Sequence, residues 1–288
     1  MKINKLFEQE KPVFSLEIFP PKKTSAIEGI YKTLDELAMV KPDFISVTYG
    51  AGGGKAGQQT CDLASYIKNN LGVEPLAHMT CVNSSEEEVR ANLERLKEHN
   101  IENVLALRGD RVEGGIENPK FAHANELAEL IRANSTMNIA GACYPEGHSE
   151  CESIDADIEN LKYKIDAGVT HLITQLFFDN EQFYVFMDKL RQSGIDTPVE
   201  AGIMPIVTTR QLERTVALSG ASLPADFTRM VSRYSQNPEA LHHAGIAYAI
   251  EQIHELLEHG VQGVHVYTMN NARVAKEIYE GVKTEMGR

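Results

Sequence analysis

The chain has 288 residues, of which 42% are hydrophobic and 24% charged, and its formal net charge is −13. This composition is typical of a globular protein large enough to bury a core without disulfides or a structural metal. Nucleic acids and anionic membrane surfaces are excluded as partners, because both repel an acidic chain that has no dense cluster of lysine and arginine.

Short apolar runs alternate along the chain with amphipathic stretches. Each run is bounded by turn residues, as expected for strands that are buried on both faces of a parallel sheet. In chain order the predicted strands are VFSLEIF from Val13, FISVTY from Phe44, EPLAHMTC from Glu74, NVLALRG from Asn103, NIAGACY from Asn138, HLITQLF from His171, VEAGIMP from Val199 and GVHVYTM from Gly263.

The segments between the strands have the spacing of helices. SSEEEVRANLERLKEHN opens with a serine cap and an acidic first turn. DADIENLKYKIDAG, NEQFYVFMDKLRQSG and EQIHELLEHG each end in glycine, the residue favoured just after a helix. In IEGIYKTLDELAMV, the apolar residues predicted to share one face are Ile27, Ile30, Leu34, Leu37 and Met39.

The connection before the last strand, residues 208–260, is too long for one helix. We expect two or three helices there, with Pro224 and Pro238 as breakers. Strict alternation of strand and helix predicts a parallel sheet, and eight such units favour a closed barrel over an open doubly wound sheet. The predicted fold class is α/β: a single (β/α)8 TIM-barrel domain over residues 1–288, with extra helices in the seventh βα connection.

Polar residues gather at the carboxyl ends of the predicted strands, which form the open mouth of this fold and carry its active sites. Each would cost about 1 to 3 kcal/mol in an apolar interior unless it is hydrogen-bonded. Their recurrence at seven strand ends therefore indicates a ligand site. They are Glu17, Thr48, Tyr49, His78, Arg108, Asp110, Tyr144, Gln175, Tyr267 and Thr268.

Two of these positions suggest a chemical role. Glu17 has apolar neighbours in SLEIFPP, so desolvation should raise its pKa and let it hold a proton for general-acid work. The alternative is an ion pair with an arginine across the barrel. Arg108 and Asp110 are two apart and face the same way if the chain is extended. They either pair with each other at the rim, contact a ligand, or do both.

The segment YGAGGGKAG contains a literal GxGxxG at Gly52, Gly54 and Gly57. A dinucleotide fingerprint would have an acidic residue at the end of the following strand, whereas Glu74 precedes that strand. Lys55 is not followed by the serine or threonine of a Walker motif. We interpret the segment as an ordinary βα loop.

The histidines, cysteines and serines indicate neither a metal site nor a nucleophilic serine. His148 and Cys151 are three apart, but no second pair completes a metal site, and no serine lies in a GxSxG elbow. We expect His265 to be a satisfied core residue. Histidines expected on helix surfaces are His242, His243, His254 and His259.

The cysteines and the first residues of the chain bear on its location. Cys61, Cys81, Cys143 and Cys151 form no CxxC pair and are typical of reduced thiols. The opening residues, MKINKLFEQEKPVF, lack the apolar region of a signal peptide. No run approaches the ~18 apolar residues of a membrane span. We therefore expect a cytoplasmic protein.

The motifs resemble those of methylenetetrahydrofolate reductase, a flavin enzyme of one-carbon metabolism and methionine biosynthesis. SLEIFPPK, FISVTYGAGG, PLAHMTC, VLALRGD, YPEGH, ITQLFFD, GIMPI and VHVYTMN follow one another in the family's order and spacing over nearly the whole chain. The resemblance implies a barrel that binds FAD noncovalently at the strand ends. NADH or NADPH would reduce the flavin and leave, and 5,10-methylenetetrahydrofolate would then be reduced to 5-methyltetrahydrofolate.

The resemblance also assigns roles to residues. Glu17 would assist opening of the folate's methylene bridge, and the charge of Asp110, near flavin and pterin, would favour hydride donation. With Glu17, the implied substrate-binding residues are Gln175, Gln211, Tyr267 and Arg273. The implied flavin-binding residues are Thr48, His78, Arg108, Gly109, Asp110, Ala124, Tyr144, His148, Asp157, Asn160 and Lys164.

Within that set, Arg108 and Lys164 suit the pyrophosphate. Asp157, Asn160 and Lys164 share one helix face. That face would reach the ribose and phosphate. The alternative is that these residues lie on a solvated helix face and bind no ligand.

Three positions depart from well-known bacterial members of that family. Thr215 stands where they have a phenylalanine, Asn271 where they have an arginine, and Tyr163 where they have another arginine. We therefore expect a different substrate wall, completed by Leu212 or another residue of the seventh connection, and a different adenine side.

Other readings of the function stay open at this point. One alternative is another flavin or pterin barrel enzyme, such as a folate-dependent methyltransferase, and another is a non-catalytic subunit of this fold. The expected partners are folate and a nicotinamide nucleotide. We also expect a homo-oligomer, and some members of the family work with a partner subunit.

Overall fold

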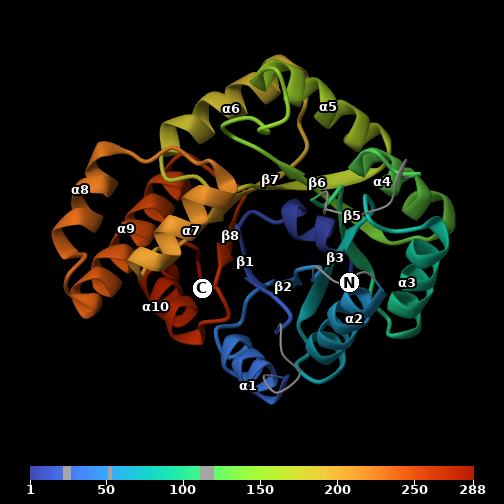
Figure 1. Cartoon of the computed structure of the whole chain (residues 1–288), viewed down its shortest axis with the longest axis horizontal. Helices are drawn as coiled ribbons and strands as arrows, with labels where there is room; N and C mark the ends of the chain where they lie inside the picture. Colours follow the sequence, from blue (N-terminus) through green and yellow to red (C-terminus); the bar gives the residue numbers. More distant parts are fainter. Residues whose placement is uncertain (22–26, 51–53, 111–119) are drawn as a thin grey trace.

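The computed structural model describes the chain outside residues 22–26, 51–53 and 111–119, and the predicted TIM barrel is confirmed (Figure 1). Eight parallel strands follow one another around the barrel in chain order, and the last pairs with the first to close it. The strands are β1 Val13–Ile18, β2 Phe44–Val47, β3 Glu74–Thr80, β4 Asn103–Leu107, β5 Asn138–Cys143, β6 Val169–Thr174, β7 Val199–Ile203 and β8 Gly263–Tyr267.

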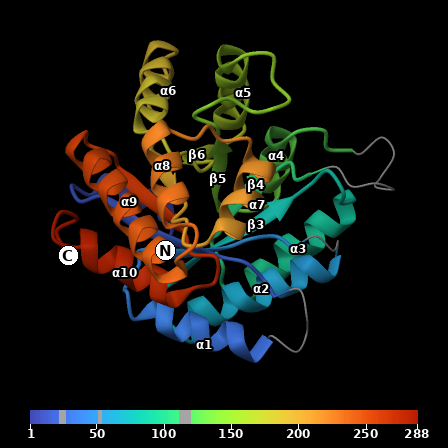
Figure 2. The ribbon, with the colours of Figure 1, turned by 60° about the vertical axis from the view of Figure 1, so that its left-hand side comes forward.

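Helices surround the barrel (Figures 1 and 2). Their bounds are η1 Ile3–Glu8, α1 Ile27–Ala38, α2 Gly54–Asn69, α3 Glu86–Glu98, α4 Ala124–Asn134, α5 Ile154–Asp166, α6 Asn180–Gln192, α7 Thr209–Ser219, α8 Ala225–Tyr234, α9 Pro238–Glu258 and α10 Ala272–Val282. Ser85 caps α3 as predicted: its hydroxyl accepts the Glu88 N–H, and the Glu88 carboxylate accepts the Ser85 N–H. Gly168, Gly194 and Gly260 follow α5, α6 and α9 with positive φ.

Two details differ from the sequence prediction. β6 begins at Val169, two residues before the predicted start. The prediction that Met39 lies on the buried face of α1 is wrong, because the helix ends at Ala38 and the Met39 residue is 80% exposed.

The seventh connection consists of three helices, α7, α8 and α9, in agreement with the predicted number. Pro224 is the residue before α8, and Pro238 is the first residue of α9. Proline is suited to a first helical turn because its missing N–H would have no partner there, so these prolines begin helices. α8 packs against α9, and α9 packs against α10 (Figure 2).

Gly245 lets α9 lie directly on the loop after β7. A Cβ atom built at this position would overlap the Ile206 carbonyl oxygen. We expect Gly245→Ala to lower the free energy of unfolding by about 1 to 3 kcal/mol. The matched control is Gly29→Ala in α1, where the new methyl group meets no described atom within 4 Å; it should stabilise by about 0.5 to 1 kcal/mol. Urea unfolding measures both, and a Gly245→Ala protein as stable as the parent would contradict the close approach.

The interior of the barrel changes from apolar to polar along its axis. At the amino-terminal end, side chains of η1 pack with Val13 and Phe44. Alternate residues of a strand face the same side, so Ser15 follows Val13 into the interior, Ser46 follows Phe44, and Glu17 comes next on β1. The two serines are completely buried. Since Val, Ile and Leu usually fill this space, the polar column marks the functional end of the barrel.

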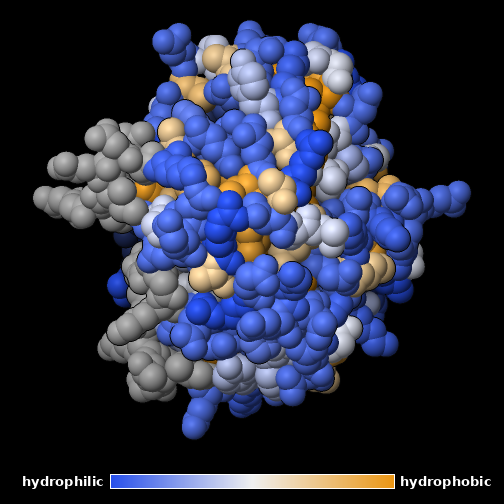
Figure 3. All heavy atoms as spheres, turned by 90° about the vertical axis from the view of Figure 1, so that its right-hand side faces the viewer, coloured by the Kyte–Doolittle hydropathy of each residue, from blue (hydrophilic) through white to orange (hydrophobic). Residues whose placement is uncertain are grey.

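The outer surface is mainly hydrophilic on the face that Figure 3 shows, where apolar atoms form small, separated patches. In the part of the chain that the structure describes, no helix is long and apolar enough to cross a membrane. All four cysteines are free thiols, in agreement with the prediction, and three of them are buried.

Candidate active site

Glu17 lies at the carboxyl end of β1 among polar side chains from three other strands. Its Oε2 atom is 3.4 Å from Ser46 Oγ on β2 and 3.5 Å from His78 Nε2 on β3. It is also 3.4 Å from His265 Nε2 on β8. These three side chains are buried. The mouth of the barrel therefore holds one carboxylate between two imidazoles and a hydroxyl group.

These neighbours lower the pKa of the Glu17 carboxyl. Burial by itself would raise it, but the hydrogen bonds from His265 and Ser46 and the charges of the two imidazoles lower it by more. The prediction of a raised pKa is therefore wrong. Glu17 has apolar neighbours in the chain, but the residues that face it across the barrel are polar. Histidines also take the place of the arginine that was considered as its partner.

Two residues after β8 hold the end of β1 in place. The Thr268 hydroxyl donates to the Glu17 carbonyl oxygen at 2.6 Å. The Asn270 side chain accepts the Phe19 N–H at 2.9 Å and donates to the Phe19 carbonyl oxygen at 2.8 Å. Thr268, predicted at a strand end, therefore positions the backbone of Glu17.

Arg108 begins the loop after β4 and forms a bidentate ion pair with Glu150, at 2.5 and 2.7 Å. Gly109 has a φ of +82°, and a Cβ atom there would come within 2.9 Å of Thr80 Cβ. The expectation that Arg108 and Asp110 face the same way depended on an extended chain, and that condition fails at Gly109. Asp110 is exposed beside the turn. Arg108 therefore pairs with Glu150, and not with Asp110 as one of the alternatives had it.

The loop after β5 and helix α5 bring five predicted cofactor residues together. The Tyr144 ring lies edge-on against His148 at 4.7 Å, and Lys164 Nζ lies 5.9 Å from the centre of the Tyr144 ring. Asp157 is buried and accepts the backbone N–H of His148 at 3.0 Å, so it holds the loop. Lys164 donates to a backbone carbonyl of β5 at 2.8 Å. Only Asn160 is exposed, so the solvated-face alternative holds for Asn160 but not for Asp157 or Lys164.

Lys164 provides a test of whether a phosphate fits here. Burial lowers the pKa of its ammonium group. Among the described residues, no carboxylate lies within ion-pair distance of it. A buried cation held only by a carbonyl group and a ring is incompletely compensated. The donor set of Lys164, Arg108 and the Gly109 turn therefore fits an anionic pyrophosphate.

The remaining predicted cofactor residues lie at the ends of elements. Thr48 is the first residue after β2, and its N–H donates to the Ile18 carbonyl oxygen at 3.0 Å. Ala124 is the buried first residue of α4. In the glycine segment, Gly52 lies outside the described residues and Gly54 begins α2.

Three of the predicted substrate residues lie at or after the ends of β6, β7 and β8. The Gln175 side chain accepts the N–H of the next residue at 2.9 Å. Tyr267 donates its hydroxyl to the Thr174 carbonyl oxygen at 2.7 Å. Gln211 accepts the Val207 N–H at 3.0 Å and donates to a loop carbonyl at 2.8 Å. Tyr267 and Gln211 therefore also stabilise the mouth of the barrel.

Arg273 and the three departures lie on, or directly before, helices α5, α7 and α10. Arg273 is exposed on α10 and pairs with Glu277 at 2.8 Å. Asn271 is the N-cap of α10, and its side chain accepts two backbone N–H groups, a structural role that arginine cannot fill. Thr215 is buried in α7, and Tyr163 is 62% exposed on α5. Leu212, expected to complete the substrate wall, packs against the apolar cluster around Leu176, Phe178, Ile206 and Phe227.

The positions of the histidines agree only in part with the prediction. His265 is a hydrogen-bonded core residue, as expected. His242 is buried and bonds to Glu277 at 2.5 Å, so its predicted place on a helix surface is wrong. α10 covers that side of α9 and supplies the Glu277 carboxylate. His243 and His259 are exposed, whereas His254 is half-buried.

Two buried histidines make stability depend on pH. Burial lowers the pKa of His78 to about 4 and that of His171 to about 3. The unfolded chain binds these protons below about pH 6.5, and the folded chain does not, so the free energy of unfolding falls as pH falls through this window. One such imidazole contributes a loss of about 2 kcal/mol between pH 7 and pH 5. Urea unfolding should show a shallower pH dependence for His171→Leu than for the parent. The exposed control His243→Gln should match the parent, and equal slopes for all three would contradict the assignment.

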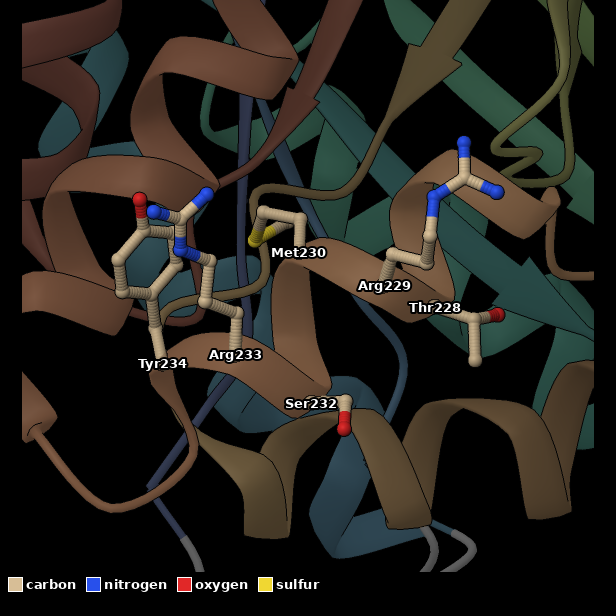
Figure 4. A pocket seen from close by; sticks show the side chains of 6 residues that line it. All are labelled: Thr228, Arg229, Met230, Ser232, Arg233 and Tyr234. Atoms are coloured by element: carbon tan, nitrogen blue, oxygen red, sulfur yellow. The ribbon is translucent and has the colours of Figure 1, made fainter.

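A hollow on helix α8 is not the active site. Its six lining side chains come from one helix and point in different directions (Figure 4). Among the described residues, no group of three or more His, Cys, Asp or Glu side chains is arranged to hold a metal ion. The polar cluster around Glu17 is therefore the candidate site.

Sequence reasoning missed Ser46 and three interior residues, Ser15, His171 and Glu200, all buried. They were not predicted because only polar residues at the carboxyl ends of the strands were considered, and these four lie deeper in the barrel. For Ser15 and Ser46 the signal was the two-residue alternation in SLE and SVT, which places the polar members of each strand on one face. The strands of His171 and Glu200 show no such alternation of polar residues.

The chain matches the family model of methylenetetrahydrofolate reductase over residues 2–283. It is 36% identical over 289 residues to "Methylenetetrahydrofolate reductase (NADH) 1" of Arabidopsis thaliana, covering 93% of this chain and 48% of the relative. It is 34% identical to the 5,10-methylenetetrahydrofolate reductase of Pectobacterium carotovorum subsp. carotovorum, covering 95% and 92%. The chain therefore spans about half the plant relative and most of the bacterial one.

Among solved structures, an uncharacterized Clostridium thermocellum protein that binds two copies of 5-methyl-5,6,7,8-tetrahydrofolic acid superimposes with a TM-score of 0.65. The match covers 100% of both chains at 12% identity. At this identity the likeness supports the fold alone.

Proposed function

This chain belongs to the methylenetetrahydrofolate reductase family, and we propose that its barrel mouth binds FAD and reduces 5,10-methylenetetrahydrofolate to 5-methyltetrahydrofolate. The name of the Arabidopsis relative supports NADH as the electron donor. The predicted homo-oligomer, partner subunit and cytoplasmic location stay predictions.

The observation that carries the proposal is that the Glu17 cluster and two cations, Arg108 and Lys164, lie at strand ends of one barrel. Arg108 and Lys164 would hold the pyrophosphate through charge-assisted hydrogen bonds. Tyr144 and His148 would line the adjoining wall. When bound, FAD would accept a hydride from the nicotinamide nucleotide and supply it to the folate. Asp110, at the rim, would favour hydride donation through its negative charge.

Glu17 would deliver the proton that opens the methylene bridge. A carboxyl group within reach of the bridge nitrogen can protonate it as the carbon–nitrogen bond breaks. His265 and Ser46 orient the carboxyl group, and Thr268 fixes the backbone behind it. Gln175, Tyr267 and Gln211, at or after the ends of three strands, would contact the pterin.

Identification of the cofactor tests this proposal. The purified protein should carry a flavin that heat releases and that chromatography identifies as FAD. It should form 5-methyltetrahydrofolate when NADH and 5,10-methylenetetrahydrofolate are added without oxygen. Release of FMN, or failure to bind any flavin after reconstitution, would contradict it.

A further inference from the structure

The barrel interior contains a second acidic residue, Glu200, which lies deeper than Glu17. Glu200 on β7 is in register with Gly263 on β8, and Gly263 is in register with Val13 at the start of β1. The side chain is completely buried. A Cβ atom at position 263 would come within 2.9 Å of Glu200 Cγ, so the glycine makes room for the carboxyl group.

Ser15 and His265 connect Glu200 with Glu17. Ser15 Oγ lies 2.8 Å from Glu200 Oε1 and 2.6 Å from His265 Nδ1. The other imidazole nitrogen, Nε2, lies 3.4 Å from Glu17 Oε2 and 3.3 Å from Ser46 Oγ. Hydroxyl and imidazole groups therefore form a continuous path between the two acids.

The surroundings of Glu200 favour its neutral form. Oε1 contacts Ser15, and Oε2 has no hydrogen-bond partner among the described residues. A carboxylate with so few hydrogen-bond partners is strongly disfavoured in a buried site. Burial raises the pKa of Glu200 well above its usual value; the hydrogen bond with Ser15 lowers it by less, and Asp43 adds a smaller increase. Burial also keeps His171 on β6 and Tyr267 on β8 uncharged near neutral pH, by lowering the pKa of the former and raising that of the latter.

The pKa values of the two carboxyl groups are thus shifted in opposite directions. Near neutral pH Glu17, whose pKa is lowered, is a carboxylate, yet it must donate a proton to the folate. Glu200, whose pKa is raised, favours the protonated form. A pair of carboxyl groups whose environments push their pKa values apart is a common basis for assigning acid and base roles.

We propose that Glu200 is the proton reservoir of the active site and that Ser15 and His265 relay its proton to Glu17. The inference rests on the proposed function, because the proton is the one that opens the methylene bridge. Glu200 donates to Ser15 Oγ, the Ser15 hydroxyl donates to His265 Nδ1, and His265 releases its Nε2 proton to the Glu17 carboxylate. Glu17 then protonates the bridge nitrogen as its bond to carbon breaks. Ser15 gains one proton as it loses another, and His265 ends as the neutral tautomer with its proton on Nδ1. After turnover a proton from solvent enters through Glu17 and passes back along the same path, which reprotonates Glu200 and returns the His265 proton to Nε2.

Glu200→Gln tests the relay, because it keeps the size of the side chain and its contact with Ser15 but removes the acidic proton. Reduction of the flavin by NADH should keep its parental rate. Re-oxidation by the folate near neutral pH should slow by about tenfold or more, less than the roughly 10²- to 10⁴-fold effect of losing a general acid itself. Lowering the pH should restore the variant toward the parent, because solvent then protonates Glu17 directly.

His171→Leu is the matched control. It removes another buried ionisable side chain of the barrel interior that no described hydrogen bond joins to Glu17, so both half-reactions should stay at parental rates. Ser15→Ala interrupts the path without changing Glu200 and should reproduce the slow, acid-rescued folate half-reaction. Parental rate and pH profile in both Glu200→Gln and Ser15→Ala would overturn the relay. So would an equal slowing of both half-reactions.

Infrared spectroscopy of the protein without substrates gives a second readout. The carbonyl-stretch band of a protonated carboxyl group should be present at neutral pH in the parent and absent in Glu200→Gln. Absence of the band in the parent would also overturn the relay. If the parent shows the band but never reduces the folate, the proposed function fails while the proton on Glu200 is still established.

Discussion

Replacing Glu17 by glutamine should abolish folate reduction and leave reduction of the flavin by NADH intact. Glutamine has nearly the same size and can still accept hydrogen bonds from His265 and Ser46, but it has no proton to transfer. Loss of a general acid slows a reaction by about 10²- to 10⁴-fold. Rapid mixing under anaerobic conditions, followed by flavin absorbance, measures the two half-reactions separately.

The contrast between the half-reactions is the informative part of this experiment. If Glu17→Gln re-oxidised at the parental rate with the folate, another group would have to be the acid. If both half-reactions slowed together, Glu17 would have a structural role at the mouth of the barrel and would not be the proton donor. The NADH half-reaction serves as the internal control for folding and flavin binding.

Arg108→Ala should weaken FAD binding by about 1.5 to 3 kcal/mol, which corresponds to roughly 10- to 100-fold in Kd. A bidentate guanidinium contact with a phosphate is lost in this variant. Because Arg108 is paired with Glu150 in the structure, a pyrophosphate has to compete with that carboxylate. Glu150→Gln is therefore the matched variant, and it should bind FAD as tightly as the parent or more tightly.

Fluorescence titration of the flavin-free protein measures both constants. Unchanged affinity in Arg108→Ala would remove Arg108 from the flavin site. Equal weakening in Arg108→Ala and Glu150→Gln would indicate that the ion pair itself shapes the loop and that neither residue contacts the phosphate.

The fold could be predicted from the sequence because its signals are local. Runs such as NVLALRG, the serine cap of α3 and the glycines after α5, α6 and α9 need no knowledge of distant residues. The strand ends also follow from the order of the elements, and this is why Glu17 and His78, far apart in the chain, were expected in one mouth.

Contacts across the barrel could not be predicted in this way. The pKa of Glu17 depends on His265, which is 248 residues away, and the partner of Arg108 lies 42 residues away in another loop. The positive φ of Gly109 breaks the extended backbone that would have made Arg108 and Asp110 face the same way. Glu200 was missed because an acidic residue in the middle of an apolar strand has meaning only once Ser15 is seen beside it.

The absorbance of the bound flavin during a single anaerobic turnover decides whether this barrel reduces 5,10-methylenetetrahydrofolate. NADH should bleach the flavin of the purified protein, and 5,10-methylenetetrahydrofolate added afterwards should restore its absorbance while one equivalent of 5-methyltetrahydrofolate forms per flavin. A flavin that NADH and NADPH both leave oxidised, or a bleached flavin that the folate does not re-oxidise, would contradict the assignment of this barrel as a methylenetetrahydrofolate reductase.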